Sequence, residues 1–196
     1  MFAVIYRHWL YLIMVDESPA AGNQGKPSET GEDADPQAVC ESLLGSTYSL
    51  QLATLGEDNV PHCGYTPFIV ERTNDQPPRF YVFVSELAVH TRDLLRASPA
   101  SIMIIEDEQK SVQVFARTRV SYQCKVSIIK PDAADYTRLL DSYQQRHGNI
   151  VSVLRGLPDF HLICLTPTKG QFVMGFGKAF ALTGPGIDQF EHSRRA

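Results

Sequence analysis

A group of hydrogen-bond donors and one fixed cation follows an apolar stretch near the middle of the sequence. Phe80–Val84 (FYVFV) has no polar alternation, which predicts a strand covered on both faces. Hydroxyls and a guanidinium beside a helix start suit an anionic group such as a phosphate or a propionate. The same residues are equally compatible with an ordinary helix start that has a solvated polar face. The donors are Ser85, His90, Thr91 and Arg92.

Two arginines on a predicted long strand, residues 114–129, form a second candidate group. Arg117 and Arg119 are two residues apart, so on a strand both side chains point to the same face. Such a pair is either the exposed edge of a sheet or the basic wall of a ligand site. From the residues alone we favour the exposed edge.

No catalytic or metal-binding motif accompanies these groups. The cysteines at positions 40, 63, 124 and 164 are widely spaced and form no CxxC pair, which argues against a zinc site built from cysteines. All four fit a reducing, cytoplasmic compartment. The sequence has no GxSxG, Walker, HExxH or GxGxxG pattern. If the protein is an enzyme, we therefore expect a bound cofactor to carry the difficult chemistry.

Length and charge limit the kinds of partner. The chain has 196 residues, of which 43% are hydrophobic and 20% charged, as is usual for one globular domain with extensions. The net charge of −4 gives no electrostatic case for nucleic acid. Residues 2–15 are apolar but too few to span a bilayer, and Arg7 and His8 interrupt them, so we expect no membrane association. We predict an N-terminal extension over residues 1–35 that is disordered from about residue 16.

The remaining pattern predicts a mainly β (α+β) fold. Short turns at 56–59 and 74–78 join the first three strands, which favours an antiparallel meander. The whole set suggests a nearly closed antiparallel barrel with flanking helices, in one domain over residues 36–182 with a C-terminal tail at 183–196. The predicted strands are 47–55, 60–71, 80–84, 100–105, 114–129, 159–166, 171–174 and 178–182, with a turn at 167–170, and the predicted helices are 36–45, 87–97, 131–146 and 150–155.

Several of these stretches resemble a known superfamily, the split-barrel proteins related to pyridoxamine 5′-phosphate oxidase. Ser85–Glu108 (SELAVHTRDLLRASPASIMIIEDE) is similar to the segment in which that superfamily binds the phosphate of FMN. Phe115–Val120 (FARTRV) and Leu157–Phe180 (LPDFHLICLTPTKGQFVMGFGKAF) resemble the haem-utilisation branch, the HugZ/HutZ-type proteins. The resemblance covers about Pro36 to Phe180, and GFGKAF is its most specific piece. The segment at Ser85 identifies the superfamily better than the ligand.

The resemblance implies an antiparallel split β-barrel of the FMN-binding type that forms a homodimer with a small-molecule site at the interface. In the haem branch that ligand is haem, which is opened oxidatively to release iron. His192 is then the candidate iron ligand, and Asp159 the carboxylate that hydrogen-bonds this histidine from the other subunit. The residues alone favour a solvated tail histidine for His192, and His62 is a weaker alternative ligand. The cofactor-binding candidates are Ser85, His90, Thr91, Arg92, Arg117 and Lys178.

Two other functions remain open from the sequence. The first is an FMN-binding oxidoreductase that uses the same barrel. The second is a non-enzymatic dimeric barrel that binds or stores a ligand without turnover.

Overall fold

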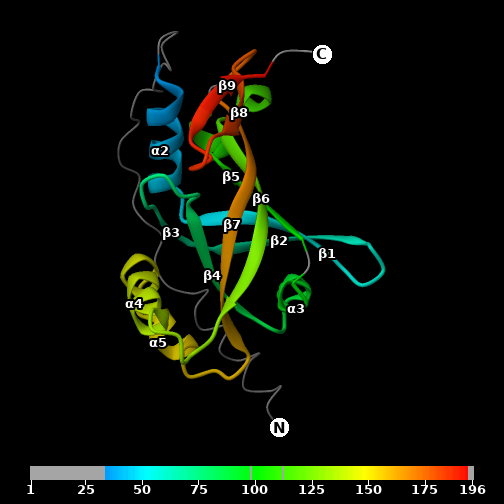
Figure 1. Ribbon diagram of the computed structural model, residues 1–196, viewed down its shortest axis with the longest axis vertical. Coiled ribbons are helices and arrows are strands. Elements are labelled where there is room, and N and C mark those ends of the chain that lie inside the picture. The colour runs from blue at the N-terminus through cyan, green and yellow to red at the C-terminus, as the bar shows by residue number, and fades with distance from the viewer. Residues whose placement is uncertain (1–33, 98, 112, 194–196) are drawn as a thin grey trace.

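A curled antiparallel sheet with helices along its outside makes up the computed structural model, which describes residues 34–97, 99–111 and 113–193 (Figure 1). The predicted disorder in the first 35 residues therefore lies almost entirely outside the described part. The helices and strands are α2 (Pro36–Ser46), β1 (Ser49–Leu55), β2 (Pro61–Pro67), β3 (Ile69–Glu71), β4 (Arg79–Ser85), α3 (Val89–Leu95), β5 (Ala100–Ile105), the 3-10 turns η1 (Glu108–Lys110) and η2 (Val114–Ala116), β6 (Arg119–Ile129), α4 (Tyr136–His147), α5 (Ile150–Leu154), β7 (Phe160–Val173), β8 (Ala179–Thr183) and β9 (Gln189–His192).

The strand order explains why the sheet closes on itself. The strands follow one another as β2-β1-β5-β6-β7-β4-β3, and β8 and β9 extend the sheet from β7. β2 and β3 are consecutive in the chain but lie at opposite ends of this order, so the short link at Phe68 joins the two ends. This arrangement confirms the predicted split barrel. The predicted three-strand meander is wrong, because the chain breaks at Pro67 and the buried Phe68 and starts a separate hairpin.

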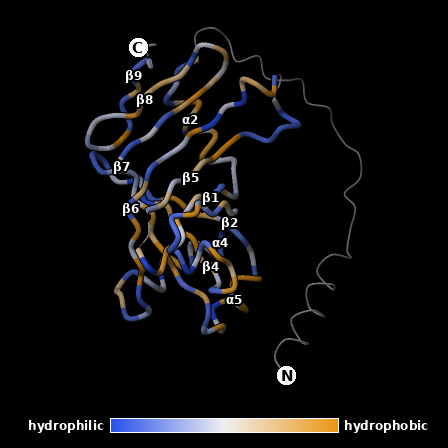
Figure 2. The backbone as a smooth tube through the Cα atoms, turned by 90° about the vertical axis from the view of Figure 1, so that its right-hand side faces the viewer, coloured by the Kyte–Doolittle hydropathy of each residue, from blue (hydrophilic) through white to orange (hydrophobic). Residues whose placement is uncertain are grey.

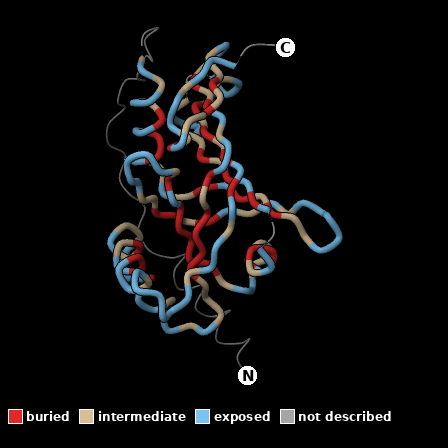
Figure 3. The backbone as a smooth tube through the Cα atoms, viewed as in Figure 1, coloured by how far each residue is buried: buried red, intermediate tan, exposed pale blue. Residues whose placement is uncertain are grey.

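The strand β4 is buried on both faces, as its sequence predicts. Phe80, Val82 and Val84 face one hydrophobic cluster, which the strands of the barrel form together with residues of α2 and α3. Tyr81 and Phe83 face a second cluster, which β4 and β7 form with α4 and α5. The strand thus runs between two cores, which is why polar and apolar residues do not alternate along it. Buried residues are concentrated in this central part of the molecule (Figure 3).

The long strand β7 corrects one sequence prediction. Residues 167–170 are not a turn but continue the strand, which pairs with β6 from Leu162 to Val173. Pro167 has no N–H to donate, and it sits beside the register shift between Gln123 and Cys124, where the ladder is already interrupted. The real turn comes later, where Gly175 and Gly177 adopt positive φ angles of 127° and 72° and lead into β8.

The start of β6 is a second correction. The predicted strand from residue 114 begins only at Arg119, because the Gln113 side chain accepts a hydrogen bond from the Phe115 N–H and closes a 3-10 turn. Arg117 follows that turn and donates from its guanidinium to the Glu106 carbonyl, while Arg119 donates to the carbonyl of Arg117. The two arginines therefore do not share a strand face.

The helices begin and end largely where the sequence indicates. The Asp35 side chain caps α2 by accepting from the backbone N–H groups of Gln37 and Ala38. α4 begins at Tyr136, later than the predicted start at residue 131, and ends at Gly148 with a φ of 84°. Hydropathy changes over short stretches of the chain (Figure 2), and no helix in the described part is long and apolar enough to cross a membrane.

The sheet continues into the region that the sequence assigns to a tail. β8 extends to Thr183, and β9 pairs with it from Gln189 to His192. The Phe190 ring packs against those of Phe172 and Phe180, at centroid distances of 5.6 and 6.1 Å. His192 therefore lies on an ordered strand.

Candidate functional site

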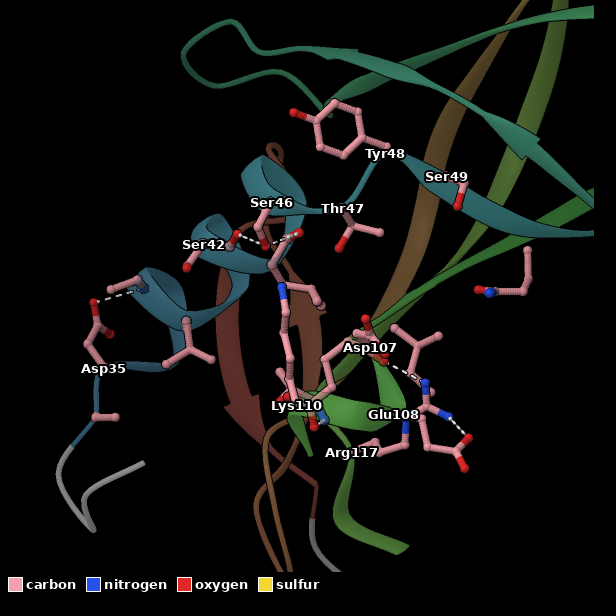
Figure 4. Close-up of a pocket in the computed structure, with 18 residues that line it drawn as sticks. Asp35, Ser42, Ser46, Thr47, Tyr48, Ser49, Asp107, Glu108, Lys110 and Arg117 are labelled. Atoms are coloured by element: carbon pink, nitrogen blue, oxygen red, sulfur yellow. Dashed lines mark hydrogen bonds and ion pairs between the residues drawn. The ribbon is translucent and has the colours of Figure 1, made fainter. Parts of the chain in front are cut away.

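A cavity of about 840 Å³ lies between α2, the start of β1 and the segment from residue 105 to 118 (Figure 4). This volume is within the range of small-molecule sites. Its apolar lining includes Val39, Leu43, Tyr48 and Ile105. The Tyr48 side chain is 61% exposed, so the cavity is open on the side of β1.

Arg117 is the sequence-predicted cation that this cavity contains. Its guanidinium donates to the Glu106 carbonyl at 2.5 Å and pairs with the Glu108 carboxylate at 3.2 Å. Its Nε is buried and has no hydrogen-bond partner among the described residues. Lys110 extends from η1 toward α2 on the same wall (Figure 4). The carboxylates of Asp35, Glu106, Asp107 and Glu108 line the same cavity, so its charged groups are acidic more often than basic and Arg117 is already paired there.

The structure brings Ser85 and Asp159 together, although they are 74 residues apart. The Ser85 hydroxyl donates to Asp159 Oδ2 at 2.5 Å and accepts from the Leu87 N–H at 3.1 Å. The Glu86 N–H donates to the Asp159 carbonyl, which fixes the backbone of both residues. No described residue donates a hydrogen bond to Asp159 Oδ1. This corner therefore holds an oriented carboxylate with a free acceptor oxygen.

The helix α3 sends its polar residues in different directions. The His90 ring packs over Gly64 of β2, and Thr91 points into the core, where its hydroxyl has no partner among the described residues. Arg92 is exposed and donates to the Glu86 carbonyl at 3.3 Å. The cluster that the sequence suggests is thus divided, and of its members Arg92 and Ser85 lie nearest the Asp159 corner.

A buried carboxylate network is the feature that sequence reasoning missed. Asp93 is 2% exposed, and its oxygens accept from Thr54 Oγ1, His62 Nδ1 and the Arg96 guanidinium, each at 2.7 Å. Burial alone would raise the pKa of Asp93, but the hydrogen bonds from His62 and Thr54, with the charge of Arg96, hold it below its ordinary value. The i, i+3 spacing of Asp93 and Arg96 was visible in the sequence. The hydrogen bonds from Thr54 on β1 and His62 on β2 could not be seen in the sequence, because they depend on how α3 packs against these strands.

His192 and Lys178 lie at the other end of the molecule. The His192 ring packs against that of Phe180 at a centroid distance of 4.3 Å and is otherwise exposed on β9. The Lys178 carbonyl accepts from the Met174 N–H and closes the β7–β8 turn. No group of three or more His, Cys, Asp or Glu side chains among the described residues could hold a metal ion. A single exposed imidazole such as His192 suits a cofactor that brings its own equatorial ligands.

The strand β7 separates the two candidate iron-site residues. Asp159 precedes its first residue, whereas β8, which pairs with its last residues, positions His192. A strand of 14 residues spans about 40 Å. Asp159 and His192 of one chain therefore cannot hydrogen-bond each other.

Replacing Asp93 by Asn tests the buried network. The folded-state pKa of Asp93 is lowered, so its stabilising effect is complete above its ordinary pKa of 3.8 and is lost as the pH falls through the folded-state value. We expect Asp93→Asn to lower the free energy of unfolding by about 1–3 kcal/mol at pH 7. In urea unfolding curves this difference should shrink as the pH falls below 3.8. Asp58→Asn, at an exposed turn position, is the control. A difference between wild type and Asp93→Asn that is independent of pH would contradict the ionised network.

Comparisons with known proteins agree with this architecture. A model of the pyridoxamine 5′-phosphate oxidase family matches residues 37–174. The protein named haem oxygenase HutZ, from Vibrio cholerae serotype O1, is 34% identical over 144 residues, which are 74% of this chain and 79% of HutZ.

Solved structures give the same result. A crystal structure of HutZ, described as the haem storage protein from Vibrio cholerae, superposes with a TM-score of 0.63 at 28% identity and covers 69% of this chain and 93% of that chain. ChuZ of Campylobacter jejuni superposes with a TM-score of 0.69 at 26% identity, over 80% of this chain and 61% of ChuZ. The chain therefore belongs to the pyridoxamine 5′-phosphate oxidase family, in the branch that contains HutZ.

Proposed function

We propose that this protein binds haem in a site shared between two subunits and opens the porphyrin oxidatively, which releases the iron. The relationship to HutZ, a protein named for haem in both sequence and structure comparisons, supports the ligand. The observation that carries the proposal is the free Oδ1 of Asp159, held in place by Ser85 and by the backbone at Glu86. This carboxylate is oriented to accept a hydrogen bond from an imidazole that the same chain does not supply.

A second copy of the chain supplies the missing half of the site. One end of each subunit carries Asp159, and the other end carries His192 and Lys178. In a two-fold dimer with antiparallel subunits, the Asp159 end of each subunit lies against the His192 end of the other. Such a dimer has two equivalent sites.

The outer face of β1, β2 and β5 is the surface that we assign to this dimer. In the register, Gln51 lies between Tyr65 on β2 and Met103 on β5, and Tyr65 is 64% exposed. Gln51 and Ile105 also line the 840 Å³ cavity, so a subunit packed on this face would close the cavity's open side. Closure would exclude water from the ligand and strengthen its electrostatic contacts.

Each chain contributes defined groups to the proposed haem site. His192 is the iron ligand, and Asp159 of the partner accepts from its ring N–H, which fixes the tautomer and raises its basicity as a ligand. Arg117 and Lys178, with Arg92 from the Asp159 end, provide cations for the propionates. Bound haem supplies the iron at which oxygen is activated. The protein's part is to orient the ring, neutralise its carboxylates and keep water out.

FMN binding is the second candidate, and two observations favour it. The family model that matches most of the chain is that of pyridoxamine 5′-phosphate oxidase. The exposed guanidinium of Arg92 is free of any carboxylate partner among the described residues and suits a phosphate. Storage of haem without turnover is the third candidate, because a structure of HutZ is described as that of a storage protein.

A titration with haem tests whether the protein binds haem and whether His192 is the iron ligand. We expect one haem per subunit to give a saturable Soret band, and His192→Ala to shift or abolish it because the iron loses its protein ligand. Glu191→Ala, the preceding exposed residue on β9, is the matched control and should leave the band unchanged. An unchanged band in His192→Ala would refute the ligand assignment. Uptake of FMN but not of haem would favour the second candidate.

Placing a charge in the assigned dimer face tests the shared site. We expect Tyr65→Glu to convert a dimer into a monomer, since the new carboxylate would be buried in the interface without a partner. Light scattering coupled to size exclusion gives the mass directly. Val153→Glu, on the exposed side of α5, should remain dimeric. A dimer that Tyr65→Glu leaves intact would place the interface elsewhere.

A further inference from the structure

Three strongly exposed apolar side chains lie at the end of the molecule that carries His192. Phe115 is 84% exposed, Phe176 is 70% exposed and Val114 is 58% exposed, and we call these three residues the apolar tip. Every other phenylalanine in the described part of the chain is buried or half-buried. An aromatic ring left in water forfeits the free energy of its burial, so a group of exposed rings is typical of a binding surface.

The strand register places both parts of the apolar tip at one end of the sheet. Arg119 pairs with Val173 at the end of the β6–β7 ladder, and η2 comes just before Arg119 while the β7–β8 turn comes just after Val173. His192 pairs with Phe180, which in turn pairs with Phe172, the neighbour of Val173. The candidate iron ligand therefore lies at the same end of the sheet as the apolar tip.

The backbone of both turns fixes where the two rings begin. The Gln113 side chain accepts from the Phe115 N–H at 3.4 Å and closes the 3-10 turn. Phe176 lies between Gly175 and Gly177, whose positive φ angles form the β7–β8 turn. A side chain at either glycine would meet nothing within 4 Å, so the space around Phe176 is open. The apolar tip is thus a preformed surface that no described residue covers.

We propose that the apolar tip is the surface on which the porphyrin ring lies when haem is bound. This inference rests on the proposed haem function, which assigns an iron ligand and cations but no apolar contact for the ring. A porphyrin is flat and extends to every side of its iron, so apolar groups close to the iron ligand contact the ring. Burying Phe115 and Phe176 against it removes apolar area of both partners from water, and offset stacking of the rings adds to the binding free energy.

The rest of the proposed dimer complements the apolar tip. At the opposite end of the subunit Leu87 is 71% exposed, and its N–H donates to the Ser85 hydroxyl. In the antiparallel dimer that end of the partner faces the tip, which gives the ring an apolar group on each side. Arg117, which is already in an ion pair, and Lys178 each lie two residues from a phenylalanine of the tip. An apolar surface bordered by cations suits a ring that carries propionates.

Titration with protoporphyrin IX, which has no iron, tests the apolar tip separately from the iron ligand. We expect Phe115→Ser and Phe176→Ser each to weaken its binding about tenfold, and the double variant about 100-fold, because apolar contact area is lost. The absorbance and fluorescence of the porphyrin measure the affinity. Both variants should remain folded, since the rings that they remove are exposed. Val60→Ser is the matched control, because Val60 is 51% exposed beside the β1–β2 turn, and it should bind as wild type.

The other outcomes separate this inference from the haem function. If wild type binds haem but the double variant binds protoporphyrin IX equally well, the inference is overturned and the haem function stands. A wild type that binds haem but not protoporphyrin IX would also overturn the inference alone, whereas one that binds neither would overturn both. Light scattering should give the double variant the same mass as wild type. Its dissociation into monomers would assign the apolar tip to a contact between subunits and would overturn the inference.

Discussion

The pairing of β6 with β7 is the constraint on which the rest of the structure depends. Its register runs from Arg119 opposite Val173 to Ile129 opposite Leu162, with one shift at Gln123/Cys124. The first half of β7 also pairs with β4, and its last residues pair with β8. The two ends of β7 therefore belong to different parts of the sheet. The ladder thereby holds the Asp159 corner and the His192 strand apart, and each end of a subunit carries only part of the proposed haem site.

The helix α3 is the second organising element, because it packs its residues on different partners. Thr91 and Asp93 are buried, His90 covers β2, and Arg92 reaches the surface near Glu86. One short helix therefore carries both Asp93, which holds the His62 ring, and the exposed Arg92. This gives the imidazole of His62 an orientation that the hairpin alone would not provide.

Much of the fold could be predicted from the sequence, since burial and turn chemistry are local properties. The apolar run of β4, the Asp35 cap and the Gly148 helix end all follow from residue type. The continuity of β7 through Pro167 could not be predicted, because a register shift in the neighbouring strand accommodates the proline. The Ser85–Asp159 contact likewise depends on the β4–β7 register, and the His62–Asp93 pair on how α3 packs. Their residue types are ordinary, and only the tertiary pairing makes them candidates for function.

Subunit complementation tests the central claim, that each site combines Asp159 of one chain with His192 of the other. Asp159→Ala and His192→Ala should each lose the wild-type haem spectrum as homodimers. When the two variants are co-refolded, half of the dimers mix them, and each mixed dimer has one intact site, so about a quarter of the sites should regain the wild-type spectrum and turnover. If mixed dimers form but neither the wild-type spectrum nor turnover returns, Asp159 and His192 do not act together across the interface. That result would contradict the shared site.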